Sequence, residues 1–152
     1  MTARPDALWF TDSRVNVRLS ARDNAGGIAV LEHQLPFGAA PPTHVHHDED
    51  EVFHILEGAI RFRVGDAERI GRAGDTVTAP RGVPHAFRVE SPLGARVITV
   101  TRGGFEAMVR SVSRPAEDAG LPPREAPTPA MIEAMGDACR ANGIDLLGPP
   151  LA

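Results

Sequence analysis

The chain has 152 residues and contains neither lysine nor tyrosine. All basic side chains are arginine, and acidic residues outnumber them to give a net charge of -4, so no basic field would attract nucleic acid or an anionic membrane surface. No apolar run is long enough to span a bilayer, and the N-terminus lacks the pattern of a secretory signal. We therefore expect a cytoplasmic protein with no nucleic-acid or membrane partner.

The lack of tyrosine and the single cysteine each exclude a kind of chemistry. The lack of tyrosine excludes a tyrosine general acid and a Cys-Tyr cross-link. Cys139 is the single cysteine, which excludes an intrachain disulfide. Because it falls within a predicted helix and has no second thiol near it, we interpret Cys139 as a small core residue.

Residues 7 to 101 have the pattern of an all-β domain, with short runs of Val, Ile, Phe and Thr separated by Gly, Pro, Asp and Asn. Such closely spaced strands are best closed as a barrel or sandwich, which hides their edges. In Ala59–Val64, Ile60 and Phe62 fall on one face and two arginines on the other, which predicts a solvated side. The predicted strands are Ala7–Thr11, Val15–Ser20, Gly27–Leu35, Val52–Leu56, Ala59–Val64, Glu68–Ala73, Asp75–Ala79, His85–Val89 and Arg96–Thr101.

The C-terminal part has a different composition. Phe105–Val112 can form a short helix, and residues 113–128 are rich in Pro, Ala and Glu, which is typical of an extended connector. Thr128 followed by Pro129 predicts the start of a second helix that ends near Ala141. Its apolar stripe is either packed core or the lining of a pocket mouth; it comprises Met131, Ile132, Met135, Ala138 and Cys139.

The residues best suited to chemistry stand between Gly38 and Gly58. His44 and His46 are two apart, so on an extended strand both imidazoles point to the same side. An antiparallel return of the next strand would bring Glu51 beside them. His85, after a turn stiffened by two prolines, would complete a set of nitrogen and carboxylate ligands that suits divalent first-row metals.

The remaining histidines and acids have plainer interpretations. We expect His33 and His54, within strands, to be hydrogen-bonded structural residues. His47 has the opposite parity to His46 and is expected to be exposed, with lining of the pocket mouth as the alternative. The acidic residues 48–50 are interpreted as a solvated turn, and the spacing favours Glu51 over Asp50 as the ligand.

The spacing of these residues resembles that of the cupin superfamily. Gly38-x5-His44-x-His46-x4-Glu51-x6-Gly58 matches the first cupin motif, and Gly74-x5-Pro80-x-Gly82-x2-His85 matches the second. The Asn that often ends the second motif is replaced by Val89, which is not a ligand position. Three short segments after the predicted barrel look like the tails of small quercetin dioxygenase-like cupins: GFE at 104–106, LPP at 121–123 and GPP at 148–150.

The resemblance implies a single cupin double-stranded β-helix, a jelly-roll barrel, over residues 1–112. Residues 113–152 would be the Pro-rich connector and a short helical extension packed on the barrel. The family's metal ligands map onto His44, His46, Glu51 and His85, although a barrel that binds no metal and keeps these residues as a polar lining is the alternative. The expected cofactor is one divalent transition metal per chain: Fe, Mn, Ni, Co, Cu or Zn.

The leading functional hypothesis is a metal-dependent dioxygenase that acts on a small enolic or polyphenolic, flavonol-like substrate. Glu51 is the carboxylate placed to act as base as well as ligand. The aromatic residues expected to line the substrate pocket are Phe37, Phe53, Phe62 and Phe87. The alternatives are a non-catalytic metal- or ligand-binding module and a non-redox isomerase, lyase or cyclase.

Besides a small-molecule substrate and dioxygen, a second copy of the chain is the expected partner. Leu8, Trp9 and Phe10 stand in a row on the first predicted strand, which is more apolar surface than a monomer should expose. By analogy with the family we expect a homodimer in which N-terminal strands contribute to the interface.

Overall fold

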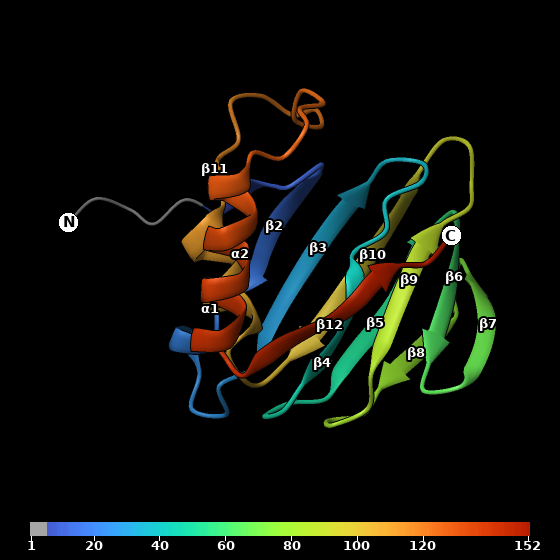
Figure 1. The fold of residues 1–152 in the computed structure, drawn as a ribbon, viewed down its shortest axis with the longest axis horizontal. Coiled ribbons are helices and arrows are strands. Elements are labelled where there is room, and N and C mark those ends of the chain that lie inside the picture. Colours follow the sequence, from blue (N-terminus) through green and yellow to red (C-terminus); the bar gives the residue numbers. More distant parts are fainter. Residues whose placement is uncertain (1–5) are drawn as a thin grey trace.

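The computed structural model describes residues 6–152 as two antiparallel sheets that face each other, with two helices gathered at one end (Figure 1). This confirms the predicted all-β fold with a short helical extension. The seven-stranded sheet has the order β11-β1-β2-β3-β10-β5-β8, and the five-stranded sheet has the order β12-β4-β9-β6-β7. The strands are β1 (Ala7–Phe10), β2 (Ser13–Leu19), β3 (Ala29–Leu35), β4 (Pro42–His46), β5 (Glu51–Glu57), β6 (Ala59–Val64), β7 (Ala67–Arg72), β8 (Thr76–Ala79), β9 (His85–Val89), β10 (Ala95–Thr101), β11 (Arg114–Pro115) and β12 (Ile144–Pro150).

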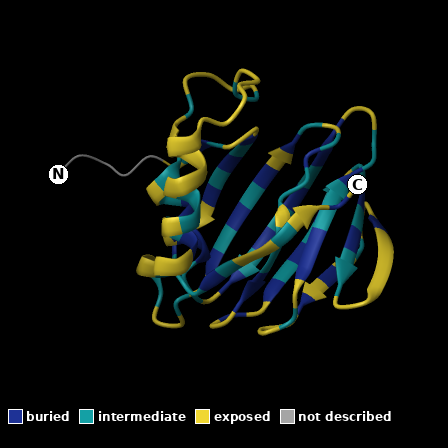
Figure 2. Cartoon of the chain, in the orientation of Figure 1, coloured by how far each residue is buried: buried dark blue, intermediate teal, exposed yellow. Residues whose placement is uncertain are grey.

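Alternating burial along the strands builds the core between the sheets (Figure 2). On β6, Ile60 and Phe62 are buried, while Arg61 and Arg63 on the opposite side are partly exposed, as the alternation predicted. Phe62 packs on Phe53 of the opposing sheet, with ring centroids 5.1 Å apart. Aromatic packing therefore joins the two layers in this part of the interior.

The helices α1 (Phe105–Val112) and α2 (Pro129–Ala141) have the predicted bounds. The Thr128 hydroxyl accepts a hydrogen bond from the Met131 backbone N–H at 3.2 Å, which caps α2 as expected. A second apolar cluster joins both helices to β2 and β3, and Cys139 is buried within it as predicted. No helix in residues 6–152 combines the length and apolarity needed to cross a membrane.

The apolar stripe of α2 is only partly core. Met131 and Ile132 are 51% and 60% exposed, whereas Met135 is half-buried against α1. The packed-core interpretation is therefore wrong for the first turn of the helix.

Three strands were not predicted. The short β11 pairs with β1, and β4 had been treated only as an extended segment. The chain then returns from α2 as β12, which pairs antiparallel with β4, Ile144 lying opposite His46. Residues 113–152 thus contribute a strand to each sheet in addition to the predicted helix.

Two of the apolar residues of β1, Leu8 and Trp9, are buried inside the chain. Leu8 packs in the cluster beneath the helices, and Trp9 is covered by the Arg114 guanidinium, 4.8 Å above its ring. The Trp9 indole N–H donates to the Gly120 carbonyl at 2.9 Å. The prediction of exposed apolar surface is wrong for Leu8 and Trp9, so the homodimer stays a prediction without this support.

Candidate metal centre

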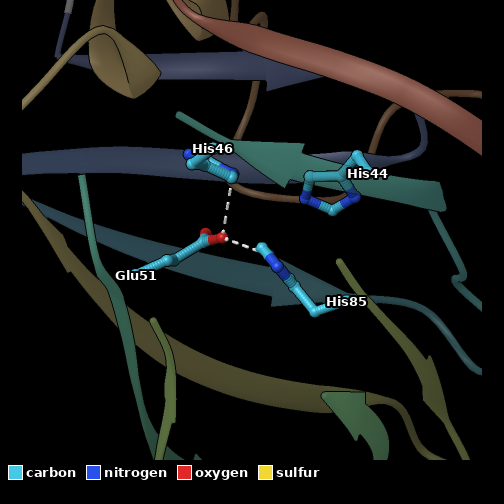
Figure 3. Close-up of side chains that lie close together, drawn as sticks. All are labelled: His44, His46, Glu51 and His85. Carbon is cyan, nitrogen blue, oxygen red and sulfur yellow. Dashed lines mark hydrogen bonds and ion pairs between the residues drawn. The ribbon is translucent and has the colours of Figure 1, made fainter. Parts of the chain in front are cut away.

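Four side chains from three strands meet inside the barrel (Figure 3). His44 and His46 come from β4, Glu51 from the start of β5 and His85 from the start of β9. Their nearest ligand atoms all lie within 4.8 Å of one another. The structure thus brings together the four predicted ligand residues.

The route by which Glu51 reaches the cluster differs from the expected one. β4 and β9 pair within the five-stranded sheet, with His44 opposite His85. Glu51 belongs to the seven-stranded sheet, because β5 pairs with β10 and β8 rather than with β4. The carboxylate therefore faces the three imidazoles across the interior, and the predicted antiparallel return beside β4 is wrong.

Each of the three imidazoles is oriented through its Nδ1 atom. His44 Nδ1 lies 2.8 Å from the Pro42 carbonyl, and His85 Nδ1 lies 3.1 Å from the Val83 carbonyl. His46 Nδ1 lies 3.3 Å from the carboxylate of Glu49. Because carbonyl and carboxylate oxygens only accept, Nδ1 carries the hydrogen in all three rings, which leaves Nε2 as a lone-pair donor in the neutral forms.

Two of the Nε2 atoms converge on one carboxylate oxygen. Glu51 Oε2 lies 3.1 Å from His46 Nε2 and 3.0 Å from His85 Nε2. His46 Nε2 is fully buried and has no hydrogen-bond partner among the described residues. A buried carboxylate oxygen facing imidazole nitrogens is stabilised by protons on the rings or by a bound cation, and imidazole nitrogen with carboxylate oxygen is a donor set for a divalent transition metal. These residues could therefore hold a metal ion.

Burial and neighbouring charges shift the pKa values of these groups. Burial lowers the pKa of His44 to about 4, with a further contribution from His85, so this imidazole is neutral at physiological pH. Burial also disfavours the charged form of His46, but the neighbouring carboxylates of Glu49 and Glu51 raise its pKa to about 9. Burial would raise the pKa of Glu51, yet His46 and His85 lower it well below the usual range. The centre thus keeps its carboxylate ionised.

A cavity of about 1260 Å³ extends from this cluster to the surface, with His44 and Glu51 in its wall. All four aromatic residues predicted for the pocket line it: Phe37, Phe53, Phe62 and Phe87. Met131 and Ile132 of α2 line it as well, together with connector residues 122–127. Part of the apolar stripe of α2 therefore borders the cavity. This agrees with the alternative prediction that the stripe lines a pocket mouth.

Comparison with known proteins identifies the family. Residues 31–101 match the family model described as a cupin domain. The chain thus contains a cupin domain over just under half of its length. Quercetin 2,3-dioxygenase of Bacillus subtilis (strain 168) is 28% identical over 86 residues, which cover 57% of this chain. The match covers 26% of that enzyme, so this cupin spans about a quarter of its length.

Solved structures support the same fold at low identity. KdgF from Halomonas sp. is 18% identical, with a TM-score of 0.53 over 59% of this chain and 79% of that one. The polyketide cyclase RemF from Streptomyces resistomycificus is 20% identical, with a TM-score of 0.53 over 66% of this chain and 69% of that one. At these identities the likeness concerns the cupin fold alone.

One buried group of the cupin centre escaped prediction. Asp48 and Asp50 are exposed as expected, but the Glu49 side chain is only 1% exposed and contacts His46, so the solvated-turn interpretation is wrong for Glu49. The available signal was its position three residues after a predicted ligand histidine, which does not by itself separate a buried acid from its exposed neighbours.

The other histidines lie where predicted. His33 is buried, with Nε2 2.9 Å from the Thr99 hydroxyl, and burial lowers its pKa to about 4. The Nδ1 atom of His54 lies 2.9 Å from the Thr76 hydroxyl. His47 is exposed and pairs with Asp145 at 2.8 Å. His33 also lines the cavity, a position that its predicted structural role did not include.

Proposed function

We propose that this cupin is a metal-dependent dioxygenase acting on a small enolic or polyphenolic substrate. The observation that carries the proposal is a cluster of three imidazoles and one ionised carboxylate beside a cavity lined with aromatic side chains, with His44 and Glu51 in the cavity wall. The match to a quercetin 2,3-dioxygenase supports the choice of substrate class.

The four residues His44, His46, Glu51 and His85 would hold one divalent ion, chosen from Fe, Mn, Ni, Co, Cu and Zn. Such an ion supplies a Lewis acid that lowers the pKa of an enolic hydroxyl and, when redox-active, a means of activating dioxygen. The Nδ1 hydrogen bonds hold the imidazoles in place before any ion binds, which reduces reorganisation on binding.

The aromatic walls would position the substrate. Phe53 and Phe87 lie with ring centroids 5.9 Å apart, nearly perpendicular to each other. Such faces and edges bind an aromatic ring and exclude water from the reacting atoms. Phe37 is half exposed and would contact the outer end of the substrate.

Glu51 has two proposed roles. Its lowered pKa favours the role of ligand, because the carboxylate stays ionised across the physiological range. The same shift makes it a weak base, which restricts its use as proton acceptor to substrates with acidic enolic hydroxyls.

Oxygen uptake tests the proposal. The protein is loaded separately with each candidate metal and offered a panel of flavonols and enediols under air. We expect uptake with at least one compound, its loss in His44→Ala and its retention in His54→Ala. If no metal form consumes oxygen with any compound, the dioxygenase proposal is rejected.

The ligand set alone does not select a redox-active ion, so two other functions share the same geometry. Turnover under strict anaerobiosis, or with zinc only, would indicate an isomerase, lyase or cyclase. A ligand captured by native mass spectrometry and recovered unchanged after aerobic incubation would indicate a binding module. A homodimer remains part of the proposal, and a monomeric mass by light scattering at micromolar concentration would contradict it.

A further inference from the structure

The Glu49 carboxylate lies at the centre of a hydrogen-bond group behind the metal centre. Its Oε1 accepts the Gly103 backbone N–H at 2.9 Å, and its Oε2 accepts the Phe105 backbone N–H at 3.1 Å. Oε2 also lies 3.3 Å from His46 Nδ1. One buried carboxylate therefore joins the loop after β4 to the start of α1 and to a predicted ligand.

The turn between β10 and α1 is shaped to receive this carboxylate. A side chain at position 103 would bring its Cβ to 3.0 Å from the Glu49 carboxyl carbon, closer than nearly all Cβ contacts. The Phe105 N–H belongs to the first turn of α1, where backbone donors lack partners within the helix and the helix dipole favours a negative charge. The local backbone thus holds Glu49 in one position.

His46 differs from the other two imidazoles in the acceptor behind it. His44 and His85 donate through Nδ1 to backbone carbonyls, whereas His46 donates to a carboxylate. A hydrogen bond from an imidazole to a carboxylate is stronger than one to a backbone carbonyl, and it makes the opposite ring nitrogen a better donor to a metal.

We propose that Glu49 is a positioning residue that keeps the proton of His46 on Nδ1 and turns Nε2 toward the centre shared with Glu51. This role rests on the proposed metal site. It extends that site from the four ligand residues to the β10–α1 turn, because Gly103 and Phe105 hold the acceptor that orients His46.

Zinc affinity tests the role without relying on catalysis. Glutamine at position 49 has a single oxygen, so it cannot accept from all three donors. We expect Glu49→Gln to bind zinc about 10 to 100 times more weakly in competition with a chromogenic chelator, as for loss of other hydrogen-bond partners of metal ligands. The matched control is Asp48→Asn, which removes the same charge from an exposed position in the same turn and should leave the affinity unchanged.

If Glu49→Gln fails to fold, a second measurement on the parent protein still tests the role of Glu49. Nitrogen-detected NMR of the zinc-loaded parent should show His46 bound through Nε2, with a slowly exchanging proton on Nδ1. Coordination through Nδ1, or equal zinc affinity of the parent and Glu49→Gln, would overturn the role of Glu49 and leave the metal site intact. A parent protein that binds no zinc or other divalent transition metal would overturn the metal site and this role together.

Discussion

His44 and His85 lie directly opposite each other on β4 and β9, with ring centroids 4.4 Å apart. They are the one residue pair in register between these strands, so the sheet itself sets the separation of two predicted ligands. Because β9 follows the Pro80–Pro84 turn at once, the site depends on a rigid approach to His85 as much as on the strand pairing.

Removal of one imidazole should abolish stable metal binding. We expect His44→Ala to bind divalent transition metals at least about 100-fold more weakly, since loss of an outer hydrogen-bond partner alone costs about 10- to 100-fold. Metal content after purification and dialysis provides the measurement. His54→Ala, outside the cluster and bonded to Thr76, is the control. Equal metal content in His44→Ala and the parent would contradict the assignment.

Metal affinity should rise with pH. Because the pKa of His46 is raised to about 9, a metal ion must displace a proton from this ring at neutral pH. The apparent affinity should increase by about tenfold per pH unit between about pH 6 and pH 8 and level off above about pH 9. Chelator-buffered titrations measure the slope, and calorimetry in buffers of different ionisation enthalpy should show about one proton released. An affinity independent of pH over this range would contradict the protonation state of His46.

Glu106 should contribute to stability at neutral pH and lose that contribution in acid. Burial would raise its pKa, but hydrogen bonds from Arg110, the Ala21 N–H and Ser20 lower it. A carboxyl whose pKa is lowered by folding stabilises the native state above its unfolded value, near 4.5, and loses that effect as pH falls through the folded value. We expect Glu106→Gln to lower the free energy of unfolding by about 1–3 kcal/mol at pH 7, with a smaller difference in acid.

Urea denaturation at pH 7 and at about pH 3.5 measures both values for Glu106→Gln. Glu117→Gln removes an acid from an exposed pair with Arg114 and should change the free energy of unfolding by less than about 1 kcal/mol. A gap between Glu106→Gln and the parent that is as large in acid as at pH 7 would count against the ionic role of Glu106.

A side chain at position 104 should disrupt the junction of α1 and α2. Its Cβ would lie 2.5 Å from the Asn142 carbonyl oxygen at the end of α2. We expect Gly104→Ala to lower the free energy of unfolding by about 1–3 kcal/mol, as for other overpacked positions. Gly148→Ala is the control, because a Cβ there meets nothing within 4 Å. Equal denaturation midpoints for the two variants would show that the junction accommodates the added side chain with no loss in the free energy of unfolding.

A charge at the cavity mouth should weaken binding of an apolar substrate. Ile132 is exposed yet lines the cavity, so contact with a ligand would bury its side chain. We expect Ile132→Asp to weaken flavonol binding about tenfold, since burial of such a side chain is worth about 1.5–3 kcal/mol when complete. Ligand fluorescence measures the flavonol affinity, and the metal content of Ile132→Asp should be unchanged. Glu133→Gln is the control. Unaltered affinity would place the ligand away from α2.

Local patterns predicted most of the barrel strands and the common orientation of His44 and His46. The parity of His44 and His46 needs only an extended backbone, and the bounds of α2 follow from the Thr128 cap with Pro129 after it. The barrel strands other than β4 were predicted within about two residues, because their apolar runs end at turn residues.

What was missed depends on contacts between distant parts of the chain. β12 contains Gly148, Pro149 and Pro150, which local propensity rejects as a strand, yet proline is tolerated at a sheet edge, where β12 lies. Glu51 reaches the imidazoles from the opposite sheet, since strand pairing is not encoded locally. The burial of Glu49 is decided by donors at Gly103 and Phe105, far along the sequence.

The pairing of β12 with β4 also means that the site is completed late in synthesis of the chain. His44 and His46 leave the ribosome long before Ile144–Pro150, the segment that borders their strand. Until then β4 has an open edge, which is a template for pairing with other chains. We therefore expect nascent chains that stall before Ile144 to aggregate readily, and any metal that the cluster holds to bind after β12 has been synthesised rather than during translation of the barrel.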